Sequence, residues 1–261
     1  MFLSLWRHRS LVIELTKREF SGKYRGSFGG AIWSLIQPLF MLAVYTVAFG
    51  VILKARWGFS GSTVDYALML FAGLIVFNLF SEVLTKSTML IVGQPNFVKK
   101  VVFPLELLPV ITVFTALVHA FIGIAVWLVG YQLLIGTPKL TILYFPLVLF
   151  CFLPVLLGVG WLLSSIGVIF RDISQITSML NHVLLFLYPI FFSIEAAPPL
   201  LQKFLLLNPL TFIVEQFRLI LFYGEIPMFN GLAIYFVLAT LFAWLSFMLF
   251  RRLRPNFANM V

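Results

Sequence analysis

The chain has 261 residues, of which 62% are hydrophobic and 10% are charged, and its mean hydropathy is +1.07. This composition excludes an ordinary soluble domain and predicts an all-α, polytopic membrane protein. The net charge of +9 does not indicate nucleic-acid binding, because the basic residues lie in short connections between apolar stretches. The single cysteine, Cys151, lies in an apolar stretch and suggests neither a disulfide nor a metal site.

The N-terminal segment, residues 8–30, alternates basic and apolar side chains before it becomes rich in glycine. Such a segment is typical of an amphipathic helix that lies at the membrane surface. The basic side chains, each of which would gain about 1 kcal/mol from anionic headgroups, are Lys17, Arg18, Lys23 and Arg25. The glycines that follow, among them Gly26 and Gly30, loosen the backbone where the chain must turn into the bilayer.

Six apolar stretches are long enough to cross the hydrocarbon core, which requires about 20 helical residues. They cover residues 31–53, 65–86, 105–135, 140–170, 175–194 and 231–250. The sequence therefore predicts a single transmembrane domain, residues 1–261, with six transmembrane helices.

The distribution of lysine and arginine over the connections predicts the orientation. One side would carry thirteen of the 18 basic residues: Arg7, Arg9, Lys17, Arg18, Lys23, Arg25, Lys86, Lys99, Lys100, Arg171, Arg251, Arg252 and Arg254. Cytoplasmic loops carry such an excess, so both termini are predicted to be cytoplasmic.

The segment between the last two predicted spans, residues 195–230, contains two apolar stretches that are too short to cross twice. Asn208 and Pro209 separate them, and the second carries Glu215 and Arg218, which lipid would not accommodate. We expect two short helices that dip into the outer leaflet and return, with these charges in a protein interior or a water-filled vestibule. The alternative is an external loop with two interfacial helices.

A second cytoplasmic element is the loop QPNFVKKVVFP, residues 94–104, which lies between two prolines. Its candidate docking residues for a soluble partner are Asn96, Phe97, Val98, Lys99 and Lys100. An ordinary basic loop that fixes topology is the alternative. The phosphate-binding pattern G-x-x-x-x-G-K-[ST] is absent, so any ATP that drives this protein would bind to another chain.

Catalytic chemistry has little support in the sequence. An intramembrane transferase for a lipid-linked sugar would require clustered carboxylates or a His-acid pair, and D-x-x-D, H-x-x-x-x-D and H-E-x-x-H are all absent. His119 falls within a predicted span, where we expect an interhelical hydrogen bond rather than a proton relay. Glu82 is expected near a membrane interface.

Aromatic residues make up 17% of the chain, which is more than two interfacial belts require. Sugars present C–H faces that pack on aromatic rings, so a conduit for a glycan would be lined with rings, although lipid contact explains most individual ones. The candidate pathway residues are Trp33, Phe40, Tyr45, Tyr188 and Phe192.

Several motifs, in their order along the chain, resemble the permease subunits of ABC-2 type polysaccharide exporters, the type V ABC exporter fold. They are REFSGKYRGSFGGAIWSLIQPL from Arg18, FAGLIVFNLFSE from Phe71, NFVKKVVFPLELLP from Asn96, FRDI from Phe170 and LLLNPLTFIVEQFR from Leu205. The permeases for O-antigen and wall teichoic acid are more similar than the capsule exporters. Drug and lipid exporters share the six-span plan and form the alternative class.

This resemblance implies a homodimer in the bacterial inner membrane, bound to two copies of a separate ATPase that holds ATP and Mg²⁺. It implies that residues 11–24 form an interface helix and that residues 96–102 form a coupling helix in a cleft of the ATPase. Residues 198–223 would be re-entrant periplasmic helices that cap the pathway, with Asn208, Pro209, Glu215 and Arg218 at the gate. The implied substrate is a glycan linked to undecaprenyl diphosphate.

Overall fold

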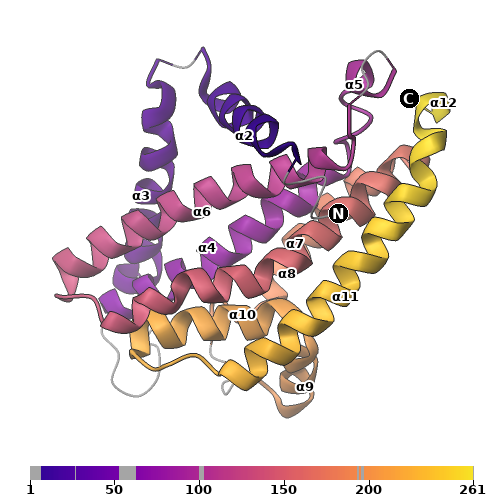
Figure 1. The fold of residues 1–261 in the computed structure, drawn as a ribbon. Helices are drawn as coiled ribbons and strands as arrows, with labels where there is room; N and C mark the ends of the chain where they lie inside the picture. The colour runs from indigo at the N-terminus through magenta and orange to yellow at the C-terminus, as the bar shows by residue number, and fades with distance from the viewer. Residues whose placement is uncertain are drawn as a thin grey trace.

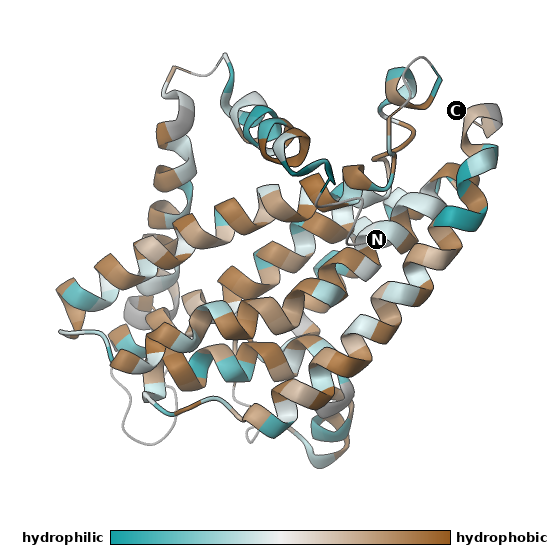
Figure 2. Ribbon diagram, viewed as in Figure 1, coloured by the Kyte–Doolittle hydropathy of each residue, from teal (hydrophilic) through white to brown (hydrophobic). Residues whose placement is uncertain are grey.

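The computed structural model describes residues 7–26, 28–52, 63–99, 103–192, 194 and 197–260. Every regular element in these ranges is a helix, in agreement with the all-α prediction (Figure 1). Four long, predominantly apolar helices run side by side through the molecule (Figure 2). They are α4 (Thr63–Ser87), α6 (Leu107–Leu134), α7 (Phe145–Ile169) and α11 (Phe229–Leu253).

These four helices match the second, third, fourth and sixth predicted spans, and each is long and apolar enough to cross a membrane. The span that contains α7 begins with a short 3₁₀ helix at Leu140–Tyr144. Small residues let the helices approach closely: a Cβ added to Gly158 of α7 would lie 2.6 Å from the Phe242 ring of α11. Glycine at this position therefore sets the spacing of the α7–α11 pair.

The first and fifth predicted spans have shorter helices. α3 (Trp33–Tyr45) continues as a π-helical segment at Thr46–Ile52, and residues 53–62 lie outside the described ranges. α8 (Ile173–Leu187) ends seven residues before residue 194, so the predicted end of this helix was wrong. The helix stops because Pro189 restricts Tyr188 to an extended conformation. In the described part of the chain, four helices meet the length requirement, or up to five if a bent pair counts as one span. The count of six stays a prediction.

Short elements mark the two ends of the molecule (Figure 1). α2 (Arg9–Tyr24), α5 (Pro95–Lys99) and α12 (Phe257–Met260) lie at one end, and α2 packs against α6. α9 (Pro199–Leu207) lies at the opposite end, beside α10 (Pro209–Arg218). Elements from both halves of the sequence thus meet at the end that the lysine and arginine distribution predicts to be cytoplasmic.

The described part of the segment between α8 and α11 contains two short helices, α9 and α10, which are bent by 91° relative to each other, and a π-helical segment at Leu219–Tyr223 that continues α10. The bend falls at Asn208, whose side chain caps α10 by accepting a hydrogen bond from the Leu210 backbone N–H. α10 packs against α4 and α7 and buries Ile213, Val214 and Phe217. This burial places α10 within the bundle rather than on an exposed loop, while its depth in the membrane stays a prediction.

Candidate functional site

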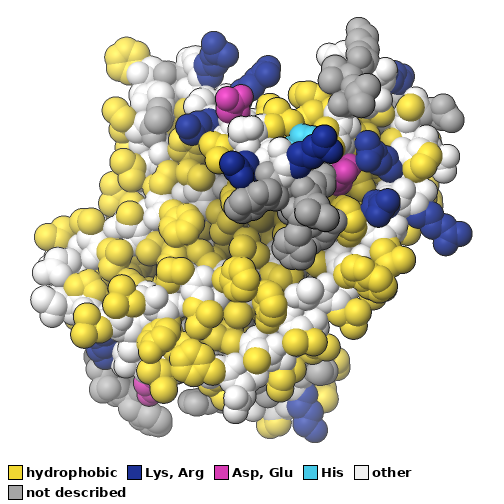
Figure 3. All heavy atoms as spheres, viewed as in Figure 1, with side chains coloured by type: hydrophobic (Ala, Val, Ile, Leu, Met, Phe, Trp, Pro, Cys, Tyr) yellow, Lys and Arg dark blue, Asp and Glu magenta, His cyan; other side chains and the backbone are white. Residues whose placement is uncertain are grey.

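Basic side chains gather over the end formed by α2, α5 and the last turn of α11 (Figure 3). The four basic residues predicted for the interface helix, Lys17, Arg18, Lys23 and Arg25, are all exposed. Val12 and Tyr24 are buried on the side of α2 that packs against α6. The helix therefore has the two-sided arrangement expected of an interfacial helix, and its contact with lipid headgroups stays a prediction.

Polar contacts also attach α2 to the long helices. The Tyr24 hydroxyl lies 3.3 Å from Nε2 of His119 on α6, and Nδ1 of His119 lies 2.8 Å from Oε2 of Glu82 on α4. Nζ of Lys86 lies 3.0 Å from a Glu19 carboxylate oxygen and 2.8 Å from the other oxygen of Glu82. The expected interhelical hydrogen bond of His119 is confirmed. Its two partners could not be identified from the sequence.

The predicted coupling residues lie on and beside α5, in the connection between α4 and α6. Asn96 and Lys99 are exposed and Phe97 and Val98 are half-buried, whereas Lys100 lies outside the described residues. The Phe97 ring packs at 4.7 Å on Phe103, which fixes α5 against the start of the α6 connection. The short helix thus presents a polar and basic side away from the bundle.

A cavity of about 440 Å³ separates α5 from the C-terminal segment and is lined by Phe97, Arg251 and Arg254. Nη1 of Arg254 also lies 2.9 Å from the Glu106 carboxylate, just before α6 begins. This ion pair joins the C-terminal segment to the same connection that carries α5. No sequence pattern indicates this pair, because 148 positions separate the two residues along the chain.

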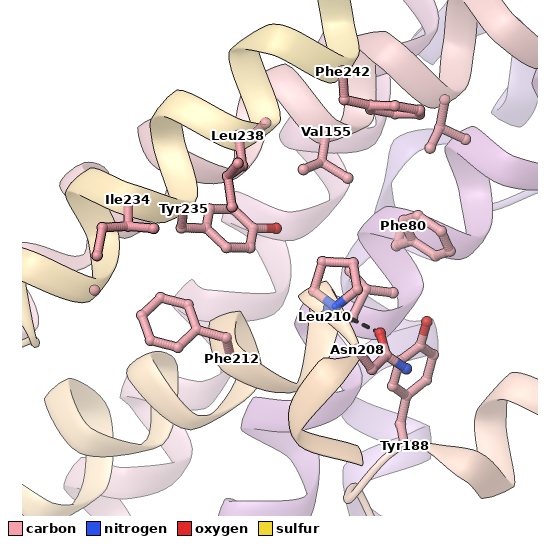
Figure 4. A pocket seen from close by; sticks show the side chains of 14 residues that line it. Phe80, Val155, Tyr188, Asn208, Leu210, Phe212, Ile234, Tyr235, Leu238 and Phe242 are labelled. Carbon is pink, nitrogen blue, oxygen red and sulfur yellow. Dashed lines mark hydrogen bonds between the residues drawn. The ribbon is translucent and has the colours of Figure 1, made fainter. Parts of the chain in front are cut away.

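At the opposite end, a largely apolar cavity of about 510 Å³ lies between α7, α10 and α11 (Figure 4). Two of the predicted gate residues, Asn208 and Pro209, line it together with Tyr188. The Asn208 side chain is within hydrogen-bonding reach of the Tyr188 hydroxyl, and the Phe212 ring stacks at 5.6 Å on Tyr235. Residues from the end of α8, from α10 and from α11 therefore share one pocket.

The other two predicted gate residues, Glu215 and Arg218, form an ion pair of 2.8 Å within α10. The Arg218 side chain is completely buried, and its Nη1 and Nη2 donate to the backbone carbonyls of Pro189 and Ile190 at 2.6 and 3.0 Å. Gly73 of α4 leaves room for the guanidinium, because an added Cβ would lie 3.2 Å from Nη2. The expectation that this charge lies in a protein interior is met, and both terminal nitrogens of the guanidinium donate to oxygen atoms there.

The five aromatic residues predicted for a substrate pathway do not line one common cavity. Trp33 and Phe40 are exposed on α3, and Phe192 is half-buried. Tyr45 lines a separate cavity of about 360 Å³ between α2, α3 and α4. Tyr188 is only 3% exposed, with an edge contact at 5.7 Å to Phe77. Their role in transport stays a prediction.

Comparison with known proteins shows which proteins this chain is similar to. A family model described as "ABC-2 type transporter" matches residues 10–222. The O-antigen export system permease protein RfbA of Myxococcus xanthus is 26% identical over 98% of this chain and 97% of its own length. A protein of the same name from Klebsiella pneumoniae is 21% identical over 96% and 95%. The polysialic acid transport protein KpsM of Escherichia coli is 27% identical over 86% of both chains.

Proposed function

Because the chain belongs to the ABC-2 type transporter family, we propose that it is the permease subunit of an ATP-driven exporter for a lipid-linked polysaccharide, foremost O-antigen. The observation that carries this proposal is the similarity, over nearly the whole chain, to permeases named for O-antigen export. The similarity to a polysialic acid transport protein supports a polysaccharide in general. Teichoic acid and capsular polysaccharide remain within the same substrate class.

The geometry supports a transport subunit whose energy comes from another chain. The sequence has no phosphate-binding loop, whereas α5 presents exposed polar and basic residues at the same end as α2. We propose that two copies of this chain bind two ATPase subunits there, and that ATP and Mg²⁺ bind to the ATPase. The chain itself would perform no covalent chemistry on the glycan, which would pass between the two copies.

The proposed location is the bacterial inner membrane, with both termini in the cytoplasm. Ser60, between the first two predicted spans, lies outside the described residues, but Ile226, just before α11 begins, is 63% exposed. In a variant that lacks Cys151, a cysteine at position 226 should react with an impermeant thiol reagent in intact cells. A cysteine at position 13, which is on exposed α2, should react only after lysis. The reverse pattern would contradict the orientation.

The decisive experiment is to delete the gene in its host and to fractionate the cells for lipid-linked glycan, with the wild-type gene restored on a plasmid as the control. Full-length polymer trapped on the cytoplasmic side, with none at the surface, is the expected result. Normal surface glycan would instead favour a drug or lipid exporter. Loss of glycan without trapped polymer would favour a biosynthetic enzyme.

A further inference from the structure

The interface helix α2 is joined to two different long helices by one continuous polar network. It runs from Glu19 to Lys86, from Lys86 to Glu82, from Glu82 to His119 and from His119 to Tyr24, with successive distances of 3.0, 2.8, 2.8 and 3.3 Å. Its first and last members lie on α2, and its inner members lie on α4 and α6. The network therefore closes a loop across three helices.

Each member of the network has a partner of the right kind. The two ring nitrogens of His119 lie against different partners, Nδ1 against the Glu82 carboxylate and Nε2 against the Tyr24 hydroxyl, and the tautomer with its proton on Nδ1 matches both. Burial, with the Glu82 carboxylate nearby, raises the pKa of Tyr24, so its hydroxyl keeps the proton that it donates. The Phe20 ring also packs at 5.3 Å on the His119 ring, which adds an apolar contact between α2 and α6 beside the polar ones.

The network reaches the last turn of α4, just before the connection that leads to α5. Lys86 lies in the last turn of α4, which ends at Ser87, and the chain then turns towards α5. On the α2 side, Arg18 and Glu19 line a cavity of about 360 Å³ together with Gln94 of that connection. A displacement of α5 would therefore reach α4 directly and α2 through Lys86.

An apolar face alone would hold α2 on the bundle, since Val12 is already buried against α6. Glu82 and His119 are only 15% and 17% exposed, so the network places charged and polar groups where desolvation is costly. Such groups fix the position of a helix more specifically than apolar contacts do, because hydrogen bonds depend on direction.

We propose that Glu19, Lys86, Glu82, His119 and Tyr24 are positioning residues that make α2 move together with α4 and α6 when the ATPase displaces α5. This inference rests on the proposed function. Because α2 leads along the chain into α3, the network would pass the displacement on to the first predicted span. Without the network, α2 would change its position relative to α4 and α6, and the ATPase would hydrolyse ATP without transport.

The test uses the purified complex of this chain with its ATPase in proteoliposomes loaded with the lipid-linked glycan. Tyr24→Phe removes one contact of α2 and Glu19→Gln removes the charge from another, and Glu14→Gln, on the exposed face of the same helix, is the matched control. We expect ATP hydrolysis to persist while glycan exported per ATP falls roughly tenfold, as for the loss of one charge-assisted hydrogen bond. If the variants export as much glycan per ATP as the wild type, whether or not both rates fall, the proposal would be overturned.

A covalent tether should restore coupling. In a Cys151→Ala background, the double variant Glu19→Cys, Lys86→Cys should lose export per ATP and regain it when a short bifunctional thiol linker joins the two positions. Failure of the cross-linked complex to recover, with hydrolysis intact, would count against a positioning role.

A substrate-independent measurement separates this inference from the proposed function. A wild-type complex that hydrolyses ATP but exports no glycan would contradict the proposed substrate. Hydrogen–deuterium exchange of the α2 amides then decides on the network: faster exchange in Glu19→Gln than in Glu14→Gln supports it, and equal exchange overturns it.

Discussion

The two ends of the bundle hold their charged side chains in different ways. At the α9–α10 end, one completely buried guanidinium, that of Arg218, donates to two backbone carbonyls at the end of the α8 segment. At the α2 end, polar and charged side chains on three helices form a network in which Glu19, Lys86, Glu82 and His119 are 15% to 35% exposed. The buried guanidinium cannot exchange its carbonyl partners for water, whereas the partly exposed groups of the α2 network can do so in part.

This difference indicates different roles for the two polar clusters. A buried charge that donates to buried carbonyls is costly to disturb, so Arg218 would hold the bend after α8 and the position of α10 in a fixed relation. Partly exposed ion pairs contribute less to the free energy of unfolding. The α2 network can therefore position α2 on α4 and α6 at a small contribution to stability, and substitutions at the two ends should separate stability from coupling.

The largest effect is expected for Arg218→Met, which keeps volume but leaves the carbonyls of Pro189 and Ile190 without their donor. Two unsatisfied buried carbonyls predict a loss of about 3 kcal/mol or more in the free energy of unfolding. Thermal unfolding in detergent, followed by fluorescence-detected gel filtration, measures it. Arg218→Lys keeps the charge but loses the forked geometry, so its loss should be intermediate. Wild-type stability of Arg218→Met would contradict the anchoring role.

A smaller loss is expected for Glu82→Gln, which weakens the contacts to His119 and Lys86 at the α2 end. Loss of charge-assisted hydrogen bonds at this partly exposed site predicts about 1–2 kcal/mol. The same unfolding assay measures it, and Glu14→Gln on the exposed face of α2 should be neutral. A loss as large as that of Arg218→Met would mean that the two ends are equally rigid.

The sequence predicted the long helices well. α4, α6, α7 and α11 each coincide with an apolar stretch that is long enough to cross a membrane. It also predicted two short helices between α8 and α11, since Asn208 and Pro209 interrupt that stretch. It misplaced the end of α8, where Pro189 stops the helix although the hydropathy continues. Hydropathy measures the extent of an apolar stretch but not the backbone geometry within it.

The contact partners of the polar residues could not be predicted from the sequence. His119 is 37 residues from Glu82 and 95 residues from Tyr24, and no spacing rule relates positions on three different helices. Similarly, Arg218 was recognised as a charge that needs a protein interior, but carbonyl groups are present at every residue, so its partners carry no sequence signal. The aromatic residues proposed for a pathway lie in clusters along the sequence, but closeness in sequence does not place their rings in one cavity.

Tyr188→Phe should have a modest effect at the α9–α10 end. The substitution keeps the packing of the ring on Phe77 and removes only the hydroxyl near Asn208. We expect a loss of about 0.5–1.5 kcal/mol, measured by the same unfolding assay. Tyr188→Ala would remove a buried ring as well, so reduced export in that variant alone would not identify a pathway residue. Normal stability with reduced export in Tyr188→Phe would do so, and would show that this end also takes part in transport.

The smallest effect on stability is expected for charge reversal at the coupling helix, Lys99→Glu combined with Lys100→Glu. Lys99 is exposed on α5, so the free energy of unfolding should change by less than about 0.5 kcal/mol. Co-purification of the ATPase should nevertheless fall, because reversed charges at an interface oppose a complementary partner surface. Arg252→Glu, an exposed reversal at the same end of the molecule, is the matched control. Equal loss of the ATPase in both variants would indicate general attraction by the basic end, whereas a loss confined to the α5 variant would place the docking site on α5.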